Sequence, residues 1–144
     1  MEYRDYGCRR TTKPDLTFWR EVYSDPDVKK FMALWGKEPS DTQEFWEYLN
    51  TSERFVVYDI TTEELVGGFT LYHRENKTAE FGIAIHPKFR GIGLGKIVLE
   101  FLEDTAKDLG IKTLKADVYQ ENKPSLSLLR GNGFRDVVFL EKNL

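Results

Sequence analysis

Apolar and polar positions recur along this chain with two different periods, and each change of period marks a predicted element. The clearest helical pattern lies between Leu94 and Leu109, where apolar side chains recur three and four positions apart until Gly110. The clearest strand pattern is Thr78–Ile85, which follows the polar turn Asn76-Lys77. The pattern therefore predicts one helix with a single buried face, preceded by a strand of the core sheet.

The rest of the chain shows the same two patterns in shorter segments. Helices are predicted from Pro14 to Ser24, over about Val28–Leu34, from an N-cap at Ser40 to about Leu49, and from Pro124 to Gly131. Further strands are predicted over Tyr3–Arg10, Phe55–Ile60, Leu65–Tyr72, Leu114–Tyr119 and Phe134–Leu140. Helices and strands alternate in the second half, so the predicted fold class is α+β, with a mixed sheet flanked by helices.

Length and composition are those of one folded domain covering residues 1–144. Hydrophobic residues make up 40% of the chain and charged residues 31%, and no repeat or linker interrupts it. The apolar runs are only strand-length and the first residues lack the pattern of a signal peptide, so we expect a cytoplasmic protein without a membrane partner. The net charge of −3 argues against a nucleic-acid partner and is compatible with a cationic substrate.

The residue pattern gives no support for metal or thiol chemistry. Cys8 is the single cysteine, which excludes an internal disulfide and a thiolate metal cluster, and we expect it to be a small buried residue. His73 and His86 are isolated in the sequence, so a turn or surface role is expected for both. No metal is therefore predicted.

The stretch Arg90-Gly91-Ile92-Gly93-Leu94-Gly95 carries the most specific chemistry. It follows a strand and opens a helix, so its glycines would let backbone N–H groups approach an anion such as a pyrophosphate. A Walker A loop would need a glycine where Arg90 stands and a Ser or Thr where Ile97 stands. A dinucleotide fingerprint fails as well, because Val98 occupies the place of its third glycine when the motif starts at Gly93.

Two motifs together resemble the GNAT N-acetyltransferase superfamily. Arg90-x-x-Gly93-x-Gly95 is similar to its acyl-CoA signature, and Asn122-x-x-Ser125-x-x-Leu128 followed by Gly133-Phe134 is similar to its second half. The strand Ala79–Ile85 resembles the branch that contains ribosomal-protein N-terminal and spermidine acetyltransferases. The resemblance covers about residues 78–134. It implies a mostly antiparallel sheet of about six strands with about four helices, splayed in the middle to bind acetyl-CoA.

The resemblance also implies a set of residues that contact acetyl-CoA. The open edge near Ile83 and Ile85 would pair with the pantetheine arm, and N–H groups from Ile92 to Lys96 would hold the pyrophosphate. The bases Lys88, Arg90 and Lys96 would offset its charge, unless they are simply solvated. Asn122 would bind the arm, unless it forms an Asx turn. The predicted contact residues are Ile83, Ile85, Arg90, Gly91, Ile92, Gly93, Leu94, Gly95, Lys96, Asn122 and Ser125.

The chemistry that the resemblance implies is direct attack of an amine on the acetyl thioester. An amine with a pKa of about 10.4 costs about 4–5 kcal/mol to deprotonate at neutral pH, whereas thiolate departure costs about 2 kcal/mol. A general base should therefore matter more than a general acid. Glu80 is the first candidate base and Asp117 the second, with a surface carboxylate and a salt bridge as the alternatives. Leu129 stands where many members have a general-acid Tyr, so Ser125 could take that role or position a water.

The acceptor is left open by the sequence. Trp35, Glu38, Glu44, Trp46 and Glu47 would suit a cationic amine, although a packed core and a solvated helix face explain them equally. A polyamine, a protein or peptide N-terminus, an amino sugar, an amino acid and a drug remain candidates. The chain runs only about ten residues past Phe134, so a homodimer that completes the acceptor pocket is an expectation. The alternative function is an acyl-CoA-binding sensor without turnover.

Overall fold

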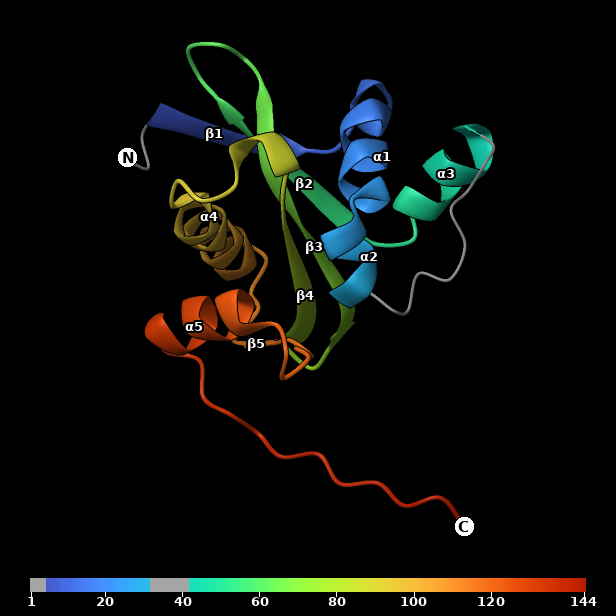
Figure 1. Cartoon of the computed structure of the whole chain (residues 1–144), viewed down its shortest axis with the longest axis vertical. Coiled ribbons are helices and arrows are strands. Elements are labelled where there is room, and N and C mark those ends of the chain that lie inside the picture. Colours follow the sequence, from blue (N-terminus) through green and yellow to red (C-terminus); the bar gives the residue numbers. More distant parts are fainter. Residues whose placement is uncertain (1–4, 32–41) are drawn as a thin grey trace.

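A five-stranded sheet forms the centre of the computed structural model, which describes residues 5–31 and 42–144 (Figure 1). Its strands lie side by side in chain order: β1 (Tyr6–Arg10), β2 (Glu53–Asp59), β3 (Leu65–Glu75), β4 (Thr78–Ile85) and β5 (Thr113–Lys115). Neighbours from β1 to β4 are antiparallel, and β5 runs parallel to β4. The predicted mixed, mostly antiparallel sheet is confirmed, with five strands among the described residues where about six were expected.

Helices cover both faces of this sheet. α1 (Leu16–Ser24), α2 (Pro26–Phe31) and α3 (Thr42–Leu49) lie on one side, and α4 (Leu94–Asp108) and α5 (Lys123–Gly131) lie on the other (Figure 1). Asn122 and Gly93 occupy the N-cap positions of α5 and α4. The predicted cap Ser40 and the last three residues of the predicted helix Val28–Leu34 lie outside the described residues.

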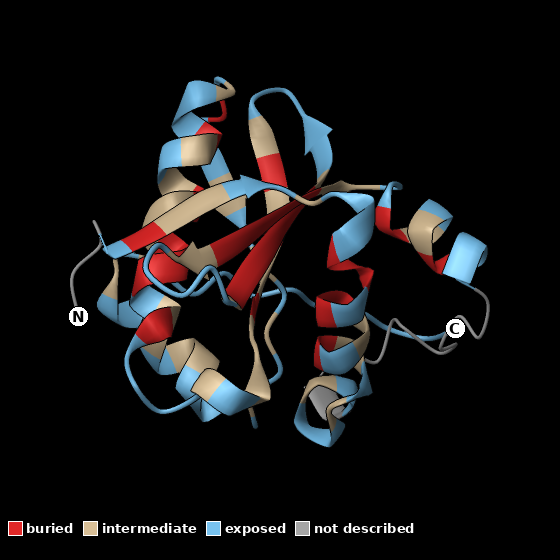
Figure 2. Ribbon diagram, turned by 90° about the horizontal axis from the view of Figure 1, so that it is seen from above, coloured by how far each residue is buried: buried red, intermediate tan, exposed pale blue. Residues whose placement is uncertain are grey.

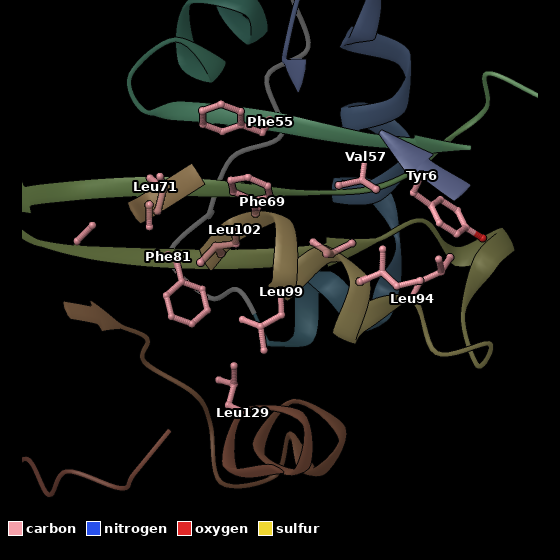
Figure 3. Packing of buried hydrophobic residues seen from close by; sticks show 14 of the residues in the cluster. Tyr6, Phe55, Val57, Phe69, Leu71, Phe81, Leu94, Leu99, Leu102 and Leu129 are labelled. Carbon is pink, nitrogen blue, oxygen red and sulfur yellow. The ribbon is translucent and has the colours of Figure 1, made fainter. Parts of the chain in front are cut away.

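The alternation of side chains along the strands divides the core between the two faces of the sheet. On the face under α4, Phe55 and Phe69 stack with their ring centroids 4.9 Å apart, and Leu71 and Phe81 continue the same layer (Figure 3). The opposite face carries Val56, Ala84 and the buried side chains of α1 and α3. We call these the α4 face and the α1 face. Figure 2 shows that buried positions follow the inner strands and the inward sides of the helices.

Cys8 was expected to be a small buried residue; in the structure it is half-buried and packs against the α4-face core. Burial raises the pKa of the Cys8 thiol to about 11, although a hydrogen bond with Thr105 partly opposes the shift. A thiol with so high a pKa holds little thiolate at neutral pH and is a poor nucleophile.

β4 and β5 separate soon after they meet. Their pairing is limited to Thr78 with Thr113, Ala79 with Leu114, and Glu80 with Lys115. Beyond Glu80, the described chain gives β4 no hydrogen-bonding strand on this side. The sheet is therefore splayed at the point where Ile83 and Ile85 lie, as expected for the fold.

The predicted strand Phe134–Leu140 does not form. Phe134 packs against Phe81 with ring centroids 5.5 Å apart, but the side chains from Val137 to Leu140 are 75% to 87% exposed. Figure 1 shows this segment running away from the sheet beyond α5. An apolar segment needs a hydrogen-bonding neighbour to become a strand. The strand predicted to end at Tyr119 ends at Lys115, so β5 has only three residues to offer as that neighbour.

No helix within the described ranges has the length and apolar character needed to span a membrane.

Candidate functional site

The glycine loop connects β4 to α4 with two residues in the left-handed region. Gly91 has φ +79° and Gly93 has φ +84°, and a Cβ at either position would meet open space. Gly93 is the N-cap of α4 and has no side chain to accept from the first helical turn. The backbone N–H groups of that turn are therefore presented at a helix N-terminus, where the dipole favours an anion.

Gly95 lies where α4 and α5 approach one another closely. A Cβ on Gly95 would stand 3.1 Å from Cδ2 of Leu128, which is tighter than ordinary packing. The second predicted motif therefore meets the first in space, because Leu128 belongs to the Asn122–Leu128 segment. The small size of Gly95 sets the distance between the two helices that carry these motifs.

The three basic residues near the loop have different surroundings. Arg90 donates from Nη2 to Asp25 Oδ2 at 2.9 Å, and its Nη1 lies 3.4 Å from Asp27 Oδ2. Lys88 pairs with Glu64 at 3.0 Å, whereas Lys96 has no carboxylate within ion-pair distance among the described residues. The Arg90 guanidinium thus connects the loop to the turn between α1 and α2.

Asp25 accepts hydrogen bonds from both sides of this connection. Burial by itself would raise the pKa of its carboxyl, but hydrogen bonds from Arg90 and from the backbone of Val28 outweigh burial and hold the pKa below its usual value. Asp25 also accepts from the backbone N–H groups of Asp27 and Val28 at 3.1 and 3.2 Å, which secures the start of α2. The charge on Asp25 is therefore satisfied by both the helix and the loop.

His86, which was expected to be isolated, is the residue that turns β4 into the loop. Its Nε2 lies 2.5 Å from Glu21 Oε2, and its Nδ1 accepts from the backbone N–H of Lys88 at 3.2 Å. The ring stacks on Phe18 with centroids 5.8 Å apart. His86 therefore holds the base of the loop against α1, a structural role at a turn.

Glu80, the first candidate base, lies on the α1 face of β4 beside open space. Its register partner is Tyr72 and that of Gly82 is Thr70, so these four positions form one patch next to the splay. No heavy atom lies within 4 Å of the point where a Cβ on Gly82 would stand. The Glu80 side chain is 31% exposed, and its carboxylate is in hydrogen-bond contact with Nδ1 of His73.

Asp117, the second candidate, lies in the same neighbourhood. Burial raises the pKa of the Tyr72 phenol, and the negative charges of Glu80 and then Asp117 raise it further. The negative charges of both carboxylates, one on each side of the splay, therefore reach the Tyr72 phenol. The structure brings the two candidate bases together around Tyr72, although Glu80 lies on β4 and Asp117 lies two residues past the end of β5.

Asn122 and Ser125 sit together at the start of α5. The Asn122 side-chain oxygen accepts from the backbone N–H of Ser125 at 3.4 Å, so Asn122 caps the helix through Oδ1. This cap does not use the Nδ2 group, which is the donor a pantetheine carbonyl would need. Leu129 is only 7% exposed and packs into the α4-face core, so a tyrosine at this position would have to displace that packing.

A hollow of about 460 Å³ opens beside this patch, between the end of α3 and the strands β2 and β3. Tyr72 and His73 line it together with Trp46, Asn50 and Arg74. Of the predicted acceptor residues, Trp46 is half-buried, Glu44 and Glu47 are exposed, and Trp35 and Glu38 lie outside the described residues. His73 was expected to have a turn or surface role, and its contact with Glu80 was not foreseen.

Comparisons with known proteins agree on one family. The model described as "Acetyltransferase (GNAT) family" matches residues 16–134. The L-amino acid N-acyltransferase MnaT of Escherichia coli is 37% identical over 136 residues, which span 89% of this chain and 78% of the relative. A putative phosphinothricin acetyltransferase of Bacillus subtilis, YwnH, is 42% identical over 69 residues, and the match spans only 42% of its length.

Solved structures match over most of the chain. The spermidine N-acetyltransferase of Vibrio cholerae, solved with CoA and spermine, superposes with a TM-score of 0.84 over 95% of this chain and 85% of that one. The sequences are 22% identical, so this likeness concerns the fold.

Proposed function

Because the chain belongs to the acetyltransferase (GNAT) family, we propose that it transfers the acetyl group of acetyl-CoA to a primary amine by direct attack in a ternary complex. The observation that carries the proposal is the position of the glycine loop, at the N-terminus of α4 and beside the opening between β4 and β5. The loop offers uncapped N–H groups to a pyrophosphate, and the strand edge beyond Glu80 offers unpaired backbone groups to amides.

Both backbone groups and side chains would contact acetyl-CoA. Backbone groups from Ile92 to Lys96 would hold the phosphates, and the Lys96 ammonium would add a charge-assisted contact. Arg90 contributes indirectly, because its ion pair with Asp25 fixes the loop against the turn between α1 and α2. Nδ2 of Asn122 would donate to the pantetheine arm while Oδ1 caps α5.

Glu80 is proposed as the base that removes the proton of the acceptor ammonium. Its carboxylate lies at the splay, beside the open space above Gly82, where an amine could approach a thioester. The negative charge of Asp117 raises the pKa of the same Tyr72, so Asp117 lies nearby. Its carboxylate would attract the cationic amine and hold it in place before the proton is removed. Ser125 at the start of α5 is the candidate that would protonate or solvate the departing thiolate, a step that costs only about 2 kcal/mol at neutral pH.

The names of the relatives suggest different acceptors. MnaT acts on L-amino acids by its name, and the Vibrio cholerae enzyme acts on spermidine. The carboxylates Glu80 and Asp117 beside Tyr72 would suit a cationic amine of either kind.

The deciding experiment measures thiol release from acetyl-CoA against a panel of amines: spermidine, L-amino acids, an alanine-terminated peptide, an amino sugar and phosphinothricin. Release that depends on one of these amines supports the proposal. Acetyl-CoA binding by calorimetry without release for any amine would favour the sensor, and absence of binding would contradict both.

Two variants of α4 test the loop. Lys96→Ala is expected to weaken acetyl-CoA binding roughly 5- to 20-fold, since one charge-assisted contact is lost. Lys107→Ala is the matched control, because Lys107 is an exposed lysine at the other end of the same helix. Equal affinities of the two variants would remove Lys96 from the binding site.

Glu80→Gln tests the base. It is expected to lower the rate roughly 100-fold or more at neutral pH, the contribution typical of a general base, and to leave acetyl-CoA affinity unchanged. The deficit should shrink as pH rises toward the pKa of the amine. A pH–rate profile identical to that of the unmodified chain would eliminate Glu80 as the base.

A further inference from the structure

His73 and Tyr72 are consecutive residues that both reach Glu80. Tyr72 is the register partner of Glu80, and Nδ1 of His73 pairs with the Glu80 carboxylate. In a regular strand, consecutive side chains point to opposite faces, so only one of the two could meet Glu80. A bulge makes the double contact possible, because the pairing of β3 with β4 shifts between Tyr72 and Glu75.

The backbone at this bulge is in a conformation that most side chains avoid. His73 has φ +48°, in the left-handed region where glycine is the usual residue. Bulges commonly re-aim a side chain next to a functional site. Here the re-aimed group is an imidazole, and its target is the candidate base. A glycine would adopt the same backbone conformation more easily, but it would give Glu80 no imidazole contact.

The imidazole also connects Glu80 to water. The His73 side chain is 76% exposed, against 31% for Glu80, and His73 lines the hollow beside β3. Its ring meets that of Tyr72 edge-on with centroids 5.0 Å apart, and this contact supports the ring in its position. An imidazole with Nδ1 on a carboxylate and most of its surface exposed to solvent can move a proton between the two.

We propose that His73 is the proton exit of the acceptor site, a positioning residue that acts through Glu80; this rests on the proposed function. The N–H bond of the acceptor ammonium breaks and its proton passes to a Glu80 oxygen. In the His73 tautomer whose hydrogen is on Nε2, Nδ1 takes that proton from Glu80 as Nε2 gives its own to water, and return exchange with water restores this tautomer. The net change is one proton moved from the amine to solvent.

Other titratable and charged groups surround the pair. Tyr72 keeps its proton because burial raises the pKa of its phenol. Arg74, the next residue of β3, is directed to Glu53 of β2 at 3.0 Å. Lys115 of β5 is the register partner of Glu80, and Asp117 follows it on the other side of the splay. Among the described residues, His73 is the side chain whose hydrogen-bond contact with the Glu80 carboxylate the structure shows.

Two substitutions separate proton transfer from structure. His73→Asn tolerates the left-handed conformation and can still donate to Glu80, but it cannot relay a proton. His73→Gly suits the backbone and leaves a space that free imidazole can enter. Asn76→Gly is the matched control, because Asn76 has φ +49° in the turn of the same hairpin and lies outside the proposed machinery.

The experiment measures kcat/KM for the amine from about pH 5 to 9, the range in which an imidazole changes charge. Both His73 variants are expected to lose about tenfold at neutral pH, with the KM for acetyl-CoA unchanged, and added imidazole should restore part of the rate of His73→Gly. Asn76→Gly should keep the profile of the unmodified chain.

The outcomes are distinct. A full rate and an unchanged pH profile in His73→Asn would overturn this inference alone, as would a deficit in His73→Gly that imidazole does not relieve. An unmodified chain that binds acetyl-CoA but releases no thiol with any amine would overturn the proposed function, and this inference with it.

Discussion

Asp15 is a buried carboxylate whose charge is held by three neighbouring groups. It is 4% exposed and accepts from both guanidinium nitrogens of Arg9 at 2.7 and 2.9 Å and from the backbone N–H of Thr12 at 2.7 Å. Burial by itself would raise the pKa of Asp15, but these hydrogen bonds outweigh burial and hold the pKa below its usual value. The carboxylate secures the turn that leads from β1 into α1.

Asp15→Asn is therefore expected to lower the free energy of unfolding by about 1–3 kcal/mol at pH 7, as for a lost hydrogen bond to a charged group. The lowered pKa means that the stabilisation is complete above the unfolded-state pKa of about 3.9 and is lost as pH falls through the folded-state value. Urea unfolding at pH 7 and pH 3 should show the difference between the two proteins shrinking in acid.

Asp136→Asn is the control for this pH dependence. Asp136 pairs with Arg130 at 2.7 Å in a similar geometry but is exposed, so its removal should have no measurable effect on stability. A deficit of Asp15→Asn that is equal at pH 3 and pH 7 would mean that packing, and not charge, is what Asp15 contributes.

At the scale of the elements, α5 joins the second motif to the core through Leu129. This side chain packs with the α4-face cluster, and Gly95 lets α4 approach α5 at the neighbouring Leu128. The general-acid position of many family members is thus part of the packing between two helices in this chain. The element that carries Asn122 and Ser125 is positioned by an apolar contact.

Leu129→Ala is expected to lower the free energy of unfolding by about 2–4 kcal/mol, because it leaves a cavity in the core. Ser127→Ala on the exposed side of the same helix should change it by less than about 0.5 kcal/mol. Leu129→Tyr should destabilise by about 1–3 kcal/mol through overpacking and should not accelerate thiol release. Faster release by Leu129→Tyr would show that a phenol can reach the leaving group from this position.

At the scale of the whole molecule, the segment from Val137 to Leu140 does not pack against the hydrophobic core. Phe139 is 84% exposed and its neighbours Val138 and Leu140 are similarly uncovered. Exposed apolar runs of this kind commonly mark contact surfaces. The homodimer expected from the sequence stays a prediction, and this segment is where it would be tested.

Phe139→Ser is expected to change the stability of the isolated fold by less than about 0.5 kcal/mol, because its ring contacts little of the chain. If the segment seats on a second copy, light scattering should show a lower association state for Phe139→Ser than for the unmodified chain. Ile60→Ser is the control, since Ile60 is 53% exposed at the turn between β2 and β3. A fully active monomer would contradict a shared acceptor pocket.

The hairpin of β3 and β4 shows where prediction from sequence stopped. Both strands and the turn at Asn76-Lys77 follow from their pattern, and a turn with two positive φ angles was compatible with these residues. The bulge left only a small signal: Leu71 and Phe81 can face the same core only if β3 has one extra residue between them and the turn. Without that register, the contact of His73 with Glu80 could not be predicted.

The sequence by itself determined the family, the element types and the glycine loop, because local periodicity, the caps and the N–H groups of a helix start depend on neighbouring residues. The tertiary structure decided what depends on distant ones. It placed Arg90 on Asp25, Leu129 in the core, and Glu80 between Tyr72 and His73. It also left the apolar pattern of Phe134–Leu140 without a strand partner, because pairing requires an edge that β5 ends too soon to provide.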